Sequence, residues 1–281
     1  MDSRYLELSL KTGKLTTNIY STSFSAGLRC IDAESREAIY SIYAFLRQAD
    51  EIVDTFHQYN KVELMNQFEQ EYYNCFKTGI SLNIIINGFV YIVKKYSIPQ
   101  ELVEAFLKSM KSDLTKNEFN TSEIKEYIYG SADVVGLMCL KVVCRDVPHM
   151  YNILKDNAMS LSSAFQKINF LRDLKNDTQN LSRTYFPTLI DKDLDDNNKR
   201  EIIEDIYKEF EHALEGIQQL PKRARTGIYL AYLFYLDLTK KIYNTPAKVI
   251  KDSRIRVSDS RKLWLFIKAN CLSFLGRSFM R

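Results

Sequence analysis

The stretch YAFLRQADEIVD (43–54) has the spacing of an amphipathic helix and carries two aspartates on it. At about 100° per residue, one narrow face of this helix holds Tyr43, Arg47, Asp50 and Asp54. The face beside it is apolar and holds Ile39, Ile42, Leu46, Ala49 and Val53. A solvent-exposed face would carry more Lys, Glu and Gln. We therefore expect the two acids to line a cleft that is flanked by apolar side chains.

A second stretch, AMSLSSAFQKINFLRDLKND (158–177), repeats this arrangement. One face of the predicted helix holds Ser162, Gln166, Asn169, Asp173 and Asp177, with Arg172 at its edge. Its apolar side holds Ala164, Ile168 and Leu171. A single pair of aspartates four residues apart is as consistent with an exposed face as with a site. Two such pairs, each with an arginine and each on an apolar helix, favour a site.

Four carboxylates in one cleft repel each other unless cations neutralise them. Mg²⁺ suits such a place because it prefers oxygen ligands and is usually held by a few carboxylates together with substrate phosphates. Mn²⁺ is the expected substitute. The neighbouring arginines would meet phosphate oxygens directly. The residues therefore predict a helical cleft with two facing acid pairs that binds Mg²⁺ and a diphosphate.

Composition agrees with a helical protein that has a sizeable core. The 281 residues are 46% hydrophobic, and Gly (9) and Pro (5) are too scarce for the many turns of an all-β fold. Apolar residues recur at helical spacing over 34–56, 61–78, 82–95, 99–115, 122–144, 147–177, 197–218 and 222–245. The polar segment 178–196 is expected to be a loop. We predict an all-α fold with one domain over residues 1–281.

Net charge and cysteine usage limit the kinds of partner and the cellular compartment that we expect. A formal net charge of +4 is too small to indicate a nucleic-acid partner. The N-terminal stretch MDSRYLELSLKTGK (1–14) has no apolar run of the kind found in secretion signals. The five cysteines form no CxxC pair and are expected to be reduced thiols; they are Cys30, Cys75, Cys139, Cys144 and Cys271. We expect a cytoplasmic protein that is soluble or peripheral to a membrane.

Other common chemistries have little support. The three histidines form no HExxH pattern, and neither a Walker A motif nor GxGxxG is present. The sequence therefore favours the acid pairs as the chemical site.

The chain resembles the squalene/phytoene synthase family, whose members join two prenyl diphosphates head to head. Within this family its motifs are most similar to those of the bacterial phytoene synthases. The resemblance spans nearly the whole chain and rests on motifs in the family's order: YSTSFSAGLR (20–29), YAFLRQADEIVD (43–54), YIYGSADVVGLMCL (127–140), AFQKINFLRDLKNDTQNLSRTYFP (164–187) and RIRVSDSRKL (254–263). It implies a bundle of the isoprenoid-synthase type with a central cleft.

The resemblance also implies roles for particular residues. The catalytic metal-binding acids would be Asp50 and Asp54 in the first motif and Asp173 and Asp177 in the second, with Asn169 assisting. Substrate-binding positions would be Tyr20, Ser21, Thr22, Ser23, Tyr43, Arg47, Gln166, Arg172, Arg183, Tyr185, Tyr235 and Arg254. Two departures stand out: Tyr20 replaces the family's frequent His, and Arg183 lies six residues beyond Asp177 where many members have five. From the sequence alone, Ser21 and Ser23 are also suited to capping a helix.

The implied activity is the Mg²⁺-dependent condensation of two geranylgeranyl diphosphates to phytoene through a cyclopropyl diphosphate, in carotenoid biosynthesis. The alternative is squalene or dehydrosqualene synthesis from two farnesyl diphosphates; a non-catalytic helical assembly factor is a more distant one. The hydrocarbon product implies peripheral membrane association. Basic residues suited to anionic lipid are Lys240, Lys241, Lys248, Lys251, Arg254, Arg256, Arg261 and Lys262. Chain length, NADPH use and oligomeric state stay open at this point.

Overall fold

The chain folds into helices joined by short loops in a computed structural model that describes residues 3–179, 183–190 and 192–274. The helices are α1 (Ser3–Tyr20), α2 (Thr22–Leu28), α3 (Ala33–Asp54), α4 (Lys61–Thr78), α5 (Ile84–Lys95), α6 (Gln100–Ser112), α7 (Thr121–Ile128), α8 (Val134–Val143), α9 (His149–Gln179), α10 (Asp196–Gln219), α11 (Lys222–Asn244), α12 (Ala247–Asp252) and α13 (Asp259–Phe274). A π-helical turn, η1 (Tyr129–Asp133), joins α7 to α8, and a short 3₁₀ turn, η2 (Pro187–Leu189), lies in the loop after α9. Within the described residues the only β-type pairing is an isolated bridge between Glu118 and Thr184. The all-α prediction is confirmed.

Local sequence signals explain where several helices begin and end. The Asp32 side chain accepts a hydrogen bond from the Ser35 amide and starts α3. Asn120 and Glu123 form a capping box at the start of α7. Gly79 ends α4 in the left-handed conformation, with φ of 86°, which glycine adopts without steric cost. These signals fix the ends of the elements that carry the site.

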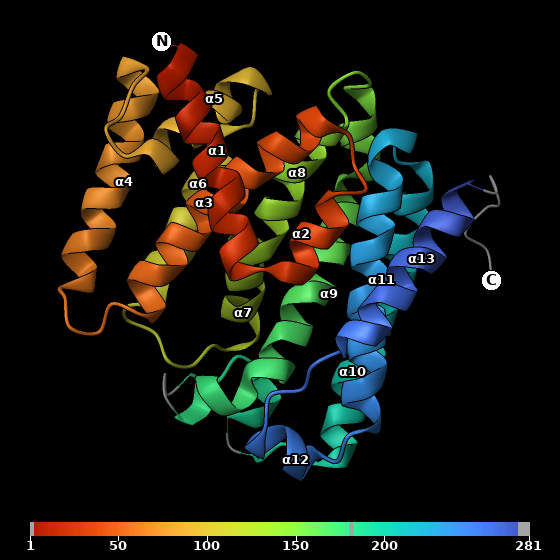
Figure 1. The fold of residues 1–281 in the computed structure, drawn as a ribbon. Coiled ribbons are helices and arrows are strands. Elements are labelled where there is room, and N and C mark those ends of the chain that lie inside the picture. Colours follow the sequence, from red (N-terminus) through yellow and green to blue (C-terminus); the bar gives the residue numbers. More distant parts are fainter. Residues whose placement is uncertain (1–2, 180–182, 191, 275–281) are drawn as a thin grey trace.

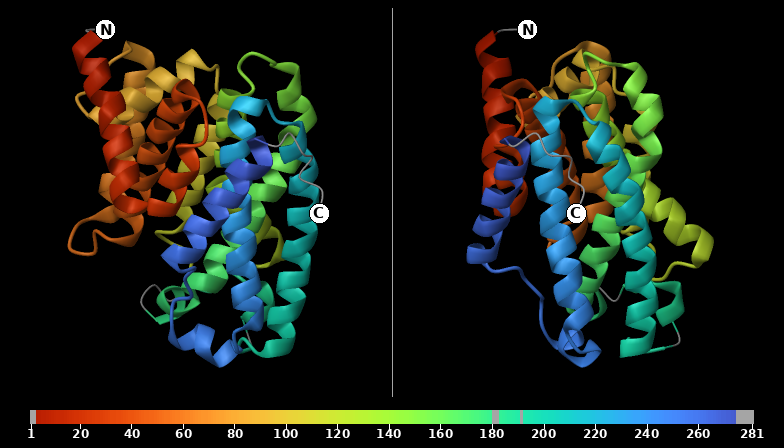
Figure 2. Two further views of the ribbon diagram at one scale, coloured as in Figure 1. Left: turned by 45° about the vertical axis from the view of Figure 1, so that its right-hand side comes forward. Right: turned by 90° about the vertical axis from the view of Figure 1, so that its right-hand side faces the viewer.

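The helices form two groups with α8 between them. Figure 1 shows α1 and α3–α6 on one side and α9–α11 with α13 on the other. Helix α8 contacts α3 and α6 in the first group and α9 in the second, and α2 packs against α11. The two further views in Figure 2 show the same division. Because α3 and α9 belong to different groups, their acid pairs approach each other from opposite sides.

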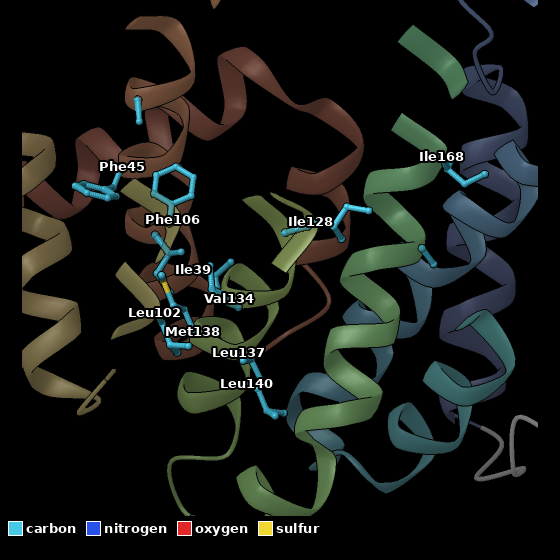
Figure 3. Close-up of a cluster of buried hydrophobic side chains, with 14 of the residues drawn as sticks. Ile39, Phe45, Leu102, Phe106, Ile128, Val134, Leu137, Met138, Leu140 and Ile168 are labelled. Atoms are coloured by element: carbon cyan, nitrogen blue, oxygen red, sulfur yellow. The ribbon is translucent and has the colours of Figure 1, made fainter. Parts of the chain in front are cut away.

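The hydrophobic core continues from one group to the other. Figure 3 shows Phe45 and Ile39 on α3 and Phe106 on α6 beside Met138 on α8. Phe45 and Met138 are fully buried, and the Phe45 ring stacks on Phe89 with 3.9 Å between centroids. Burying a large apolar side chain contributes about 1.5–3 kcal/mol. This packing gives the acid pairs rigid helical supports.

Two expectations about helices need correction. The single helix expected over 122–144 is interrupted by η1. At this turn the chain comes close to α6, since a Cβ on Gly130 would lie 2.7 Å from the Ala105 carbonyl oxygen. Helices α1, α2, α12 and α13 were not among the predicted segments. Helices α2 and α12 have only seven and six residues, and α1 and α13 carry large apolar residues on exposed as well as buried sides, so no single apolar face stands out.

Cysteine chemistry and hydrophobicity follow expectation in the described part of the chain. Cys75, Cys139 and Cys144 keep free thiols, and burial raises the pKa of each. The Cys271 side chain lies outside the described residues. Among the described helices, none combines the length and the hydrophobicity needed to cross a bilayer.

Candidate active site

The first acid pair lies near the end of α3. Asp50 and Asp54 are one helical turn apart, and Arg47 donates to Asp50 with 3.3 Å between Nη1 and Oδ2. Arg47 also forms an ion pair with Glu51, and its guanidinium lies 4.4 Å from the centroid of the Tyr20 ring. The acids and the arginine therefore share one face of α3, as the spacing predicts.

The second acid pair lies in the last turns of α9. Asp173 receives two arginines: Arg172 Nε lies 3.1 Å from both carboxylate oxygens, and Arg254 Nε lies 2.7 Å from Oδ1. One turn earlier, Asn169 accepts a hydrogen bond of 3.1 Å from the Tyr235 hydroxyl. Arg254 comes from the segment between α12 and α13. Three separate parts of the chain thus meet at the second pair.

Arg183 links the two acid pairs. Its Nη1 donates to Asp54 Oδ1 at 2.9 Å, and its backbone N–H donates to the Asp177 carbonyl oxygen at 2.8 Å. The Arg183 side chain is only 5% exposed. One buried residue therefore contacts the first pair with its side chain and the second pair with its backbone. It does so although it lies six residues beyond Asp177, where many family members have five.

A fifth acid, Asp113, completes this network and was not predicted from the sequence. It follows the end of α6, and its side chain is 4% exposed. The Tyr127 hydroxyl donates to Asp113 Oδ2 at 3.0 Å, and Arg183 Nη2 donates to the Asp113 carbonyl oxygen at 2.8 Å. The polar stretch SDLTK (112–116) resembles an ordinary exposed helix end, so periodicity gave no signal here. Asp113 provides a buried anchor for Arg183.

The acid pairs are electrostatically coupled, since charges on one pair shift pKa values in the other. Burial, followed by the neighbouring charge of Asp54, raises the pKa of Asp50 to about 7. Burial, followed by the charges of Asp173 and Asp54, raises the pKa of Asp177 to about 7. Asp54 thus acts on acids from both helices. Such a constellation favours binding of a cation, since a positive charge relieves the repulsion.

The predicted metal ligands are close but are not gathered around one point in this structure. Among residues 3–179, 183–190 and 192–274, no three His, Cys, Asp or Glu side chains are arranged to hold a metal ion. Arginines neutralise Asp50, Asp54 and Asp173 instead. The donor set nevertheless fits a hard divalent cation such as Mg²⁺ or Mn²⁺, because it consists of carboxylate oxygens with the amide oxygen of Asn169 nearby.

The predicted substrate-binding residues of the N-terminal motif lie beside the first pair. Tyr20 ends α1 and is 48% exposed. Ser21 caps α2 by accepting from the Phe24 amide at 3.4 Å, and its substrate-binding role stays a prediction. The Tyr43 ring stacks on Phe24 at 5.2 Å, and burial raises the pKa of Tyr43 to about 12. The side chains of Thr22 and Ser23 lie outside the described residues.

The remaining predicted residues divide between the cleft and the core. Gln166 is half-buried on the acid-bearing face of α9, and Tyr235 stacks on Phe165 with 3.8 Å between centroids. Tyr185 is buried, stacks on Phe170 at 4.1 Å and accepts from Arg183 at 3.3 Å. Tyr185 thus contacts Arg183 within the site network, and its substrate-binding role stays a prediction.

An apolar cavity of about 200 Å³ lies along α9, before the turns that carry the second acid pair. Its wall on α9 begins at Phe165 and Ser162, directly before Gln166, and continues to Leu154. The other walls come from α2, α3, α8, α10 and α11. Gly136 keeps the α8 wall close to α9, because a Cβ there would lie 2.1 Å from Ser162 Oγ. The acid-bearing turns of α9 therefore continue directly from the wall of an apolar cavity.

We expect activity and stability to respond to pH in opposite directions. In the folded protein the pKa of Asp50 and of Asp177 is about 7, so both keep their protons up to about that pH. In the unfolded chain they release these protons near the ordinary pKa of 3.8. The stability that this protonation contributes is fully present below about pH 4 and is lost as pH rises to about 7. Metal-dependent activity needs the ionised acids and should rise over the same range.

This pH dependence is measured as diphosphate release at pH 5.5–8.5 at several Mg²⁺ concentrations. Metal binding competes with protons, so more Mg²⁺ should move the acid limb to lower pH. An acid limb that stays fixed while Mg²⁺ varies would contradict the assignment of these acids as metal ligands.

Comparisons with known proteins define the fold class first. A dehydrosqualene synthase crystallised with a ligand matches 97% of this chain and 98% of its own with a TM-score of 0.79 at 18% identity. Squalene synthase HpnC from Alicyclobacillus acidocaldarius matches 89% of this chain and 97% of its own with a TM-score of 0.72 at 16% identity. The fold is the helical isoprenoid-synthase fold, as the sequence predicts.

The family follows from the sequence itself. The profile of the squalene/phytoene synthase family matches residues 17–261, and the chain belongs to this family. It is 26% identical over 249 residues to the phytoene synthase of Arthrospira platensis, covering 79% of this chain and 80% of that one. It is 26% identical over 242 residues to the chloroplastic phytoene synthase 1 of Zea mays, covering 79% of this chain and 58% of that protein.

Family membership supports head-to-head prenyl transfer of the phytoene or squalene type as the general activity. The family uses divalent metal ions to bind prenyl diphosphates, which agrees with the oxygen-rich donor set at the cleft mouth. The roles of individual site residues stay predictions.

Proposed function

We propose that the protein condenses two geranylgeranyl diphosphates to phytoene through a cyclopropyl diphosphate, in carotenoid biosynthesis and with Mg²⁺ as cofactor. The observation that supports the substrate assignment is the apolar cavity along α9, whose wall from Leu154 to Phe165 precedes the acid-bearing turns of the same helix. The phytoene synthases among the relatives support the same assignment.

The length argument compares the cavity wall with the prenyl chain. Fifteen residues of α9 separate Asn169 from Leu154, which at 1.5 Å per residue is about 22 Å. Three bonds of an extended chain span about 3.5 Å, so the four chain bonds of an isoprene unit span about 4.5 Å. A geranylgeranyl chain then needs about 18 Å and a farnesyl chain about 14 Å. The cavity wall itself, from Phe165 to Leu154, spans about 16 Å, and only with the four residues up to Asn169 is the path long enough for the longer chain.

The chain's own residues would bind and release diphosphate at the cleft mouth. Arg47, Arg172 and Arg254 are paired with acids there and can exchange a carboxylate for a phosphate oxygen. Asp50, Asp54, Asp173 and Asp177 would hold the divalent cation, with Asn169 beside them. When bound, this cation supplies Lewis acidity that stabilises the departing diphosphate. The arginines would stabilise the same developing charge.

The bond changes follow from the substrates. The C–O bond of one prenyl diphosphate breaks, diphosphate leaves and an allylic cation remains. The C2–C3 double bond of the second substrate supplies the electrons of the new C–C bond, and loss of a proton closes the cyclopropane. The second C–O bond then breaks, the skeleton rearranges, and a second proton leaves to form the central double bond. Released diphosphate or a tyrosine can accept these protons.

The apolar cavity has two tasks in this sequence. It excludes water, which would capture the cation as an alcohol. Its aromatic residues, including Phe24 and Phe165, offer π faces to positive charge. Both tasks suit a cavity lined mainly by apolar side chains.

A blocking substitution tests the substrate assignment. Ala158 lines the cavity eleven residues from Asn169, about 16 Å along the helix. Ala158→Phe should leave room for a farnesyl chain and exclude the end of a geranylgeranyl chain. We expect kcat/KM for geranylgeranyl diphosphate to fall about a hundredfold relative to kcat/KM for farnesyl diphosphate. A steric clash deep in the cavity discriminates more strongly than the loss of one methylene contact.

Leu161→Met, on the same wall, is the matched control because it nearly conserves volume. It should keep the ratio of the two substrates within about threefold. If Ala158→Phe leaves geranylgeranyl turnover unchanged, the chain does not lie along α9. Wild-type turnover of farnesyl diphosphate alone would favour the alternative, squalene or dehydrosqualene synthesis.

We further propose that the protein works in the cytoplasm at the membrane surface. The product of the proposed reaction is a long hydrocarbon that dissolves in lipid and not in water. Peripheral attachment would let the product pass from the cavity into a bilayer without crossing bulk water.

A further inference from the structure

Helix α13 presents large apolar side chains to the outside. Leu263, Trp264 and Ile267 retain 61%, 48% and 53% of their accessible surface. At spacings of one, three and four residues they share one side of the helix. The opposite side, with Leu265 and Ala269, is buried against the neighbouring helix α11. Helix α13 thus has an inner apolar face and an outer one.

Helix α1 has the same unusual feature. Leu8, Leu15 and Ile19 are 51%, 60% and 69% exposed, and they lie seven and four residues apart on one stripe. The other side of α1 packs on α3 and α5. Figure 1 shows α1 and α13 on the face toward the viewer, and the right-hand view of Figure 2 shows both along the same edge. We call this side of the molecule the α1–α13 face.

Cations surround the apolar residues of the α1–α13 face. Arg261 lies 4.5 Å and Lys268 5.4 Å from the centroid of the Trp264 ring. Lys11 and Lys14 are exposed on α1 beside Leu15. Arg261 also pairs with Asp237, and Lys11 with Glu7, so part of this positive charge is balanced within the protein. Arg254 contacts Asp173 at the site and is not counted with this face.

Exposed apolar side chains ringed by Lys and Arg, with a tryptophan among them, match an anionic lipid surface. Amphipathic helices lie in such an interface with the apolar side inserted and the cations near lipid phosphates. Tryptophan prefers the headgroup level because its ring is apolar and its N–H is polar. A water-facing protein surface gains nothing from this combination, and contiguous apolar patches usually mark interaction sites.

We propose that the α1–α13 face docks on an anionic bilayer, with Leu263, Trp264 and Ile267 inserted in the headgroup region. This docking rests on the proposed function, because its purpose is to pass a hydrocarbon product into lipid. Helix α13 packs on α11, and α11 lines the apolar cavity, so the docked face lies next to a wall of the cavity that would hold the prenyl chain.

The chain carries its own reporter, because Trp264 is its single tryptophan. Purified full-length protein is titrated with vesicles of phosphatidylcholine alone and with phosphatidylglycerol added. We expect a blue shift of the tryptophan emission and quenching by brominated lipid, with anionic vesicles strongly preferred and binding weakened by salt.

A double variant, Leu263→Ser with Ile267→Ser, should weaken vesicle binding about tenfold or more. The matched control, Ile80→Ser with Leu82→Ser, changes residues that are 54% and 93% exposed between α4 and α5, and it should bind like the wild type. Diphosphate release from prenyl substrate in detergent solution should survive in both variants, which separates failure of docking from failure of the catalytic proposal.

Two outcomes would overturn the proposal. Vesicles that bind the protein without quenching Trp264, or do not bind it at all, would exclude insertion of α13. A blue shift that depends on protein concentration without vesicles, together with a dimer mass, would show that a second copy of the chain covers this face.

Discussion

Asp177→Asn should lower prenyl turnover by a factor of about 10² to 10³ while raising thermal stability. The loss follows because the carboxylate is a predicted metal ligand, and removing one electrostatic contact to a departing group costs this much in comparable sites. The gain follows because Asp177 is 9% exposed and its pKa is raised to about 7 by burial and by Asp173 and Asp54. Asparagine removes that repulsion.

The measurement is kcat/KM from diphosphate release, paired with the melting temperature at pH 8 without metal. We expect the melting temperature to rise by about 2 °C or more, since about 1 kcal/mol shifts a chain of this size by about 2–4 °C. Asp156→Asn, an exposed acid on the same helix, is the control and should change neither quantity. A variant that loses stability together with activity would indicate a structural role for Asp177.

Arg183→Met should destabilise the protein strongly and also abolish turnover. The Arg183 side chain is 5% exposed and pairs with Asp54 and with Asp113, whose side chain is 4% exposed. Removing the arginine leaves a buried acid without its cation, which costs about 3–5 kcal/mol. The melting temperature at pH 8 should therefore fall by about 10 °C.

A second substitution distinguishes this cause from lost packing. Asp113→Asn in the Arg183→Met background should recover a large part of the lost stability, because the uncompensated buried charge is gone. Turnover should not return, since Asp54 still lacks its partner. Arg200→Met, at an exposed position on α10, serves as the control. No recovery in the double variant would show that Arg183 stabilises by packing alone.

Helical periodicity was sufficient to predict the acid-bearing faces. Asp50 and Asp54, and likewise Asp173 and Asp177, recur at helical spacing beside apolar residues, and this pattern depends only on the chain within one helix. Resemblance added Arg183 and Arg254, which come from segments without periodicity. The structure places both of them on the predicted acids.

Contacts between distant segments could not be predicted in this way. Asp113 becomes part of the site only because α6 ends beside Arg183 and Tyr127, and no local pattern encodes that meeting. Tyr185 is a predicted substrate-binding residue, and its stacking on Phe170 and its contact with Arg183 also depend on distant segments. The break at η1 depends on the approach of Gly130 to α6. Each of these features is set by tertiary packing.

Product identification tests the central claim most directly. Purified protein is incubated with Mg²⁺ and geranylgeranyl or farnesyl diphosphate, with and without NADPH, and the hydrocarbon is identified by mass spectrometry. We predict phytoene from geranylgeranyl diphosphate without NADPH. Hydrocarbon from farnesyl diphosphate alone would contradict the assigned chain length, and no diphosphate release from either substrate would contradict catalysis at the acid pairs.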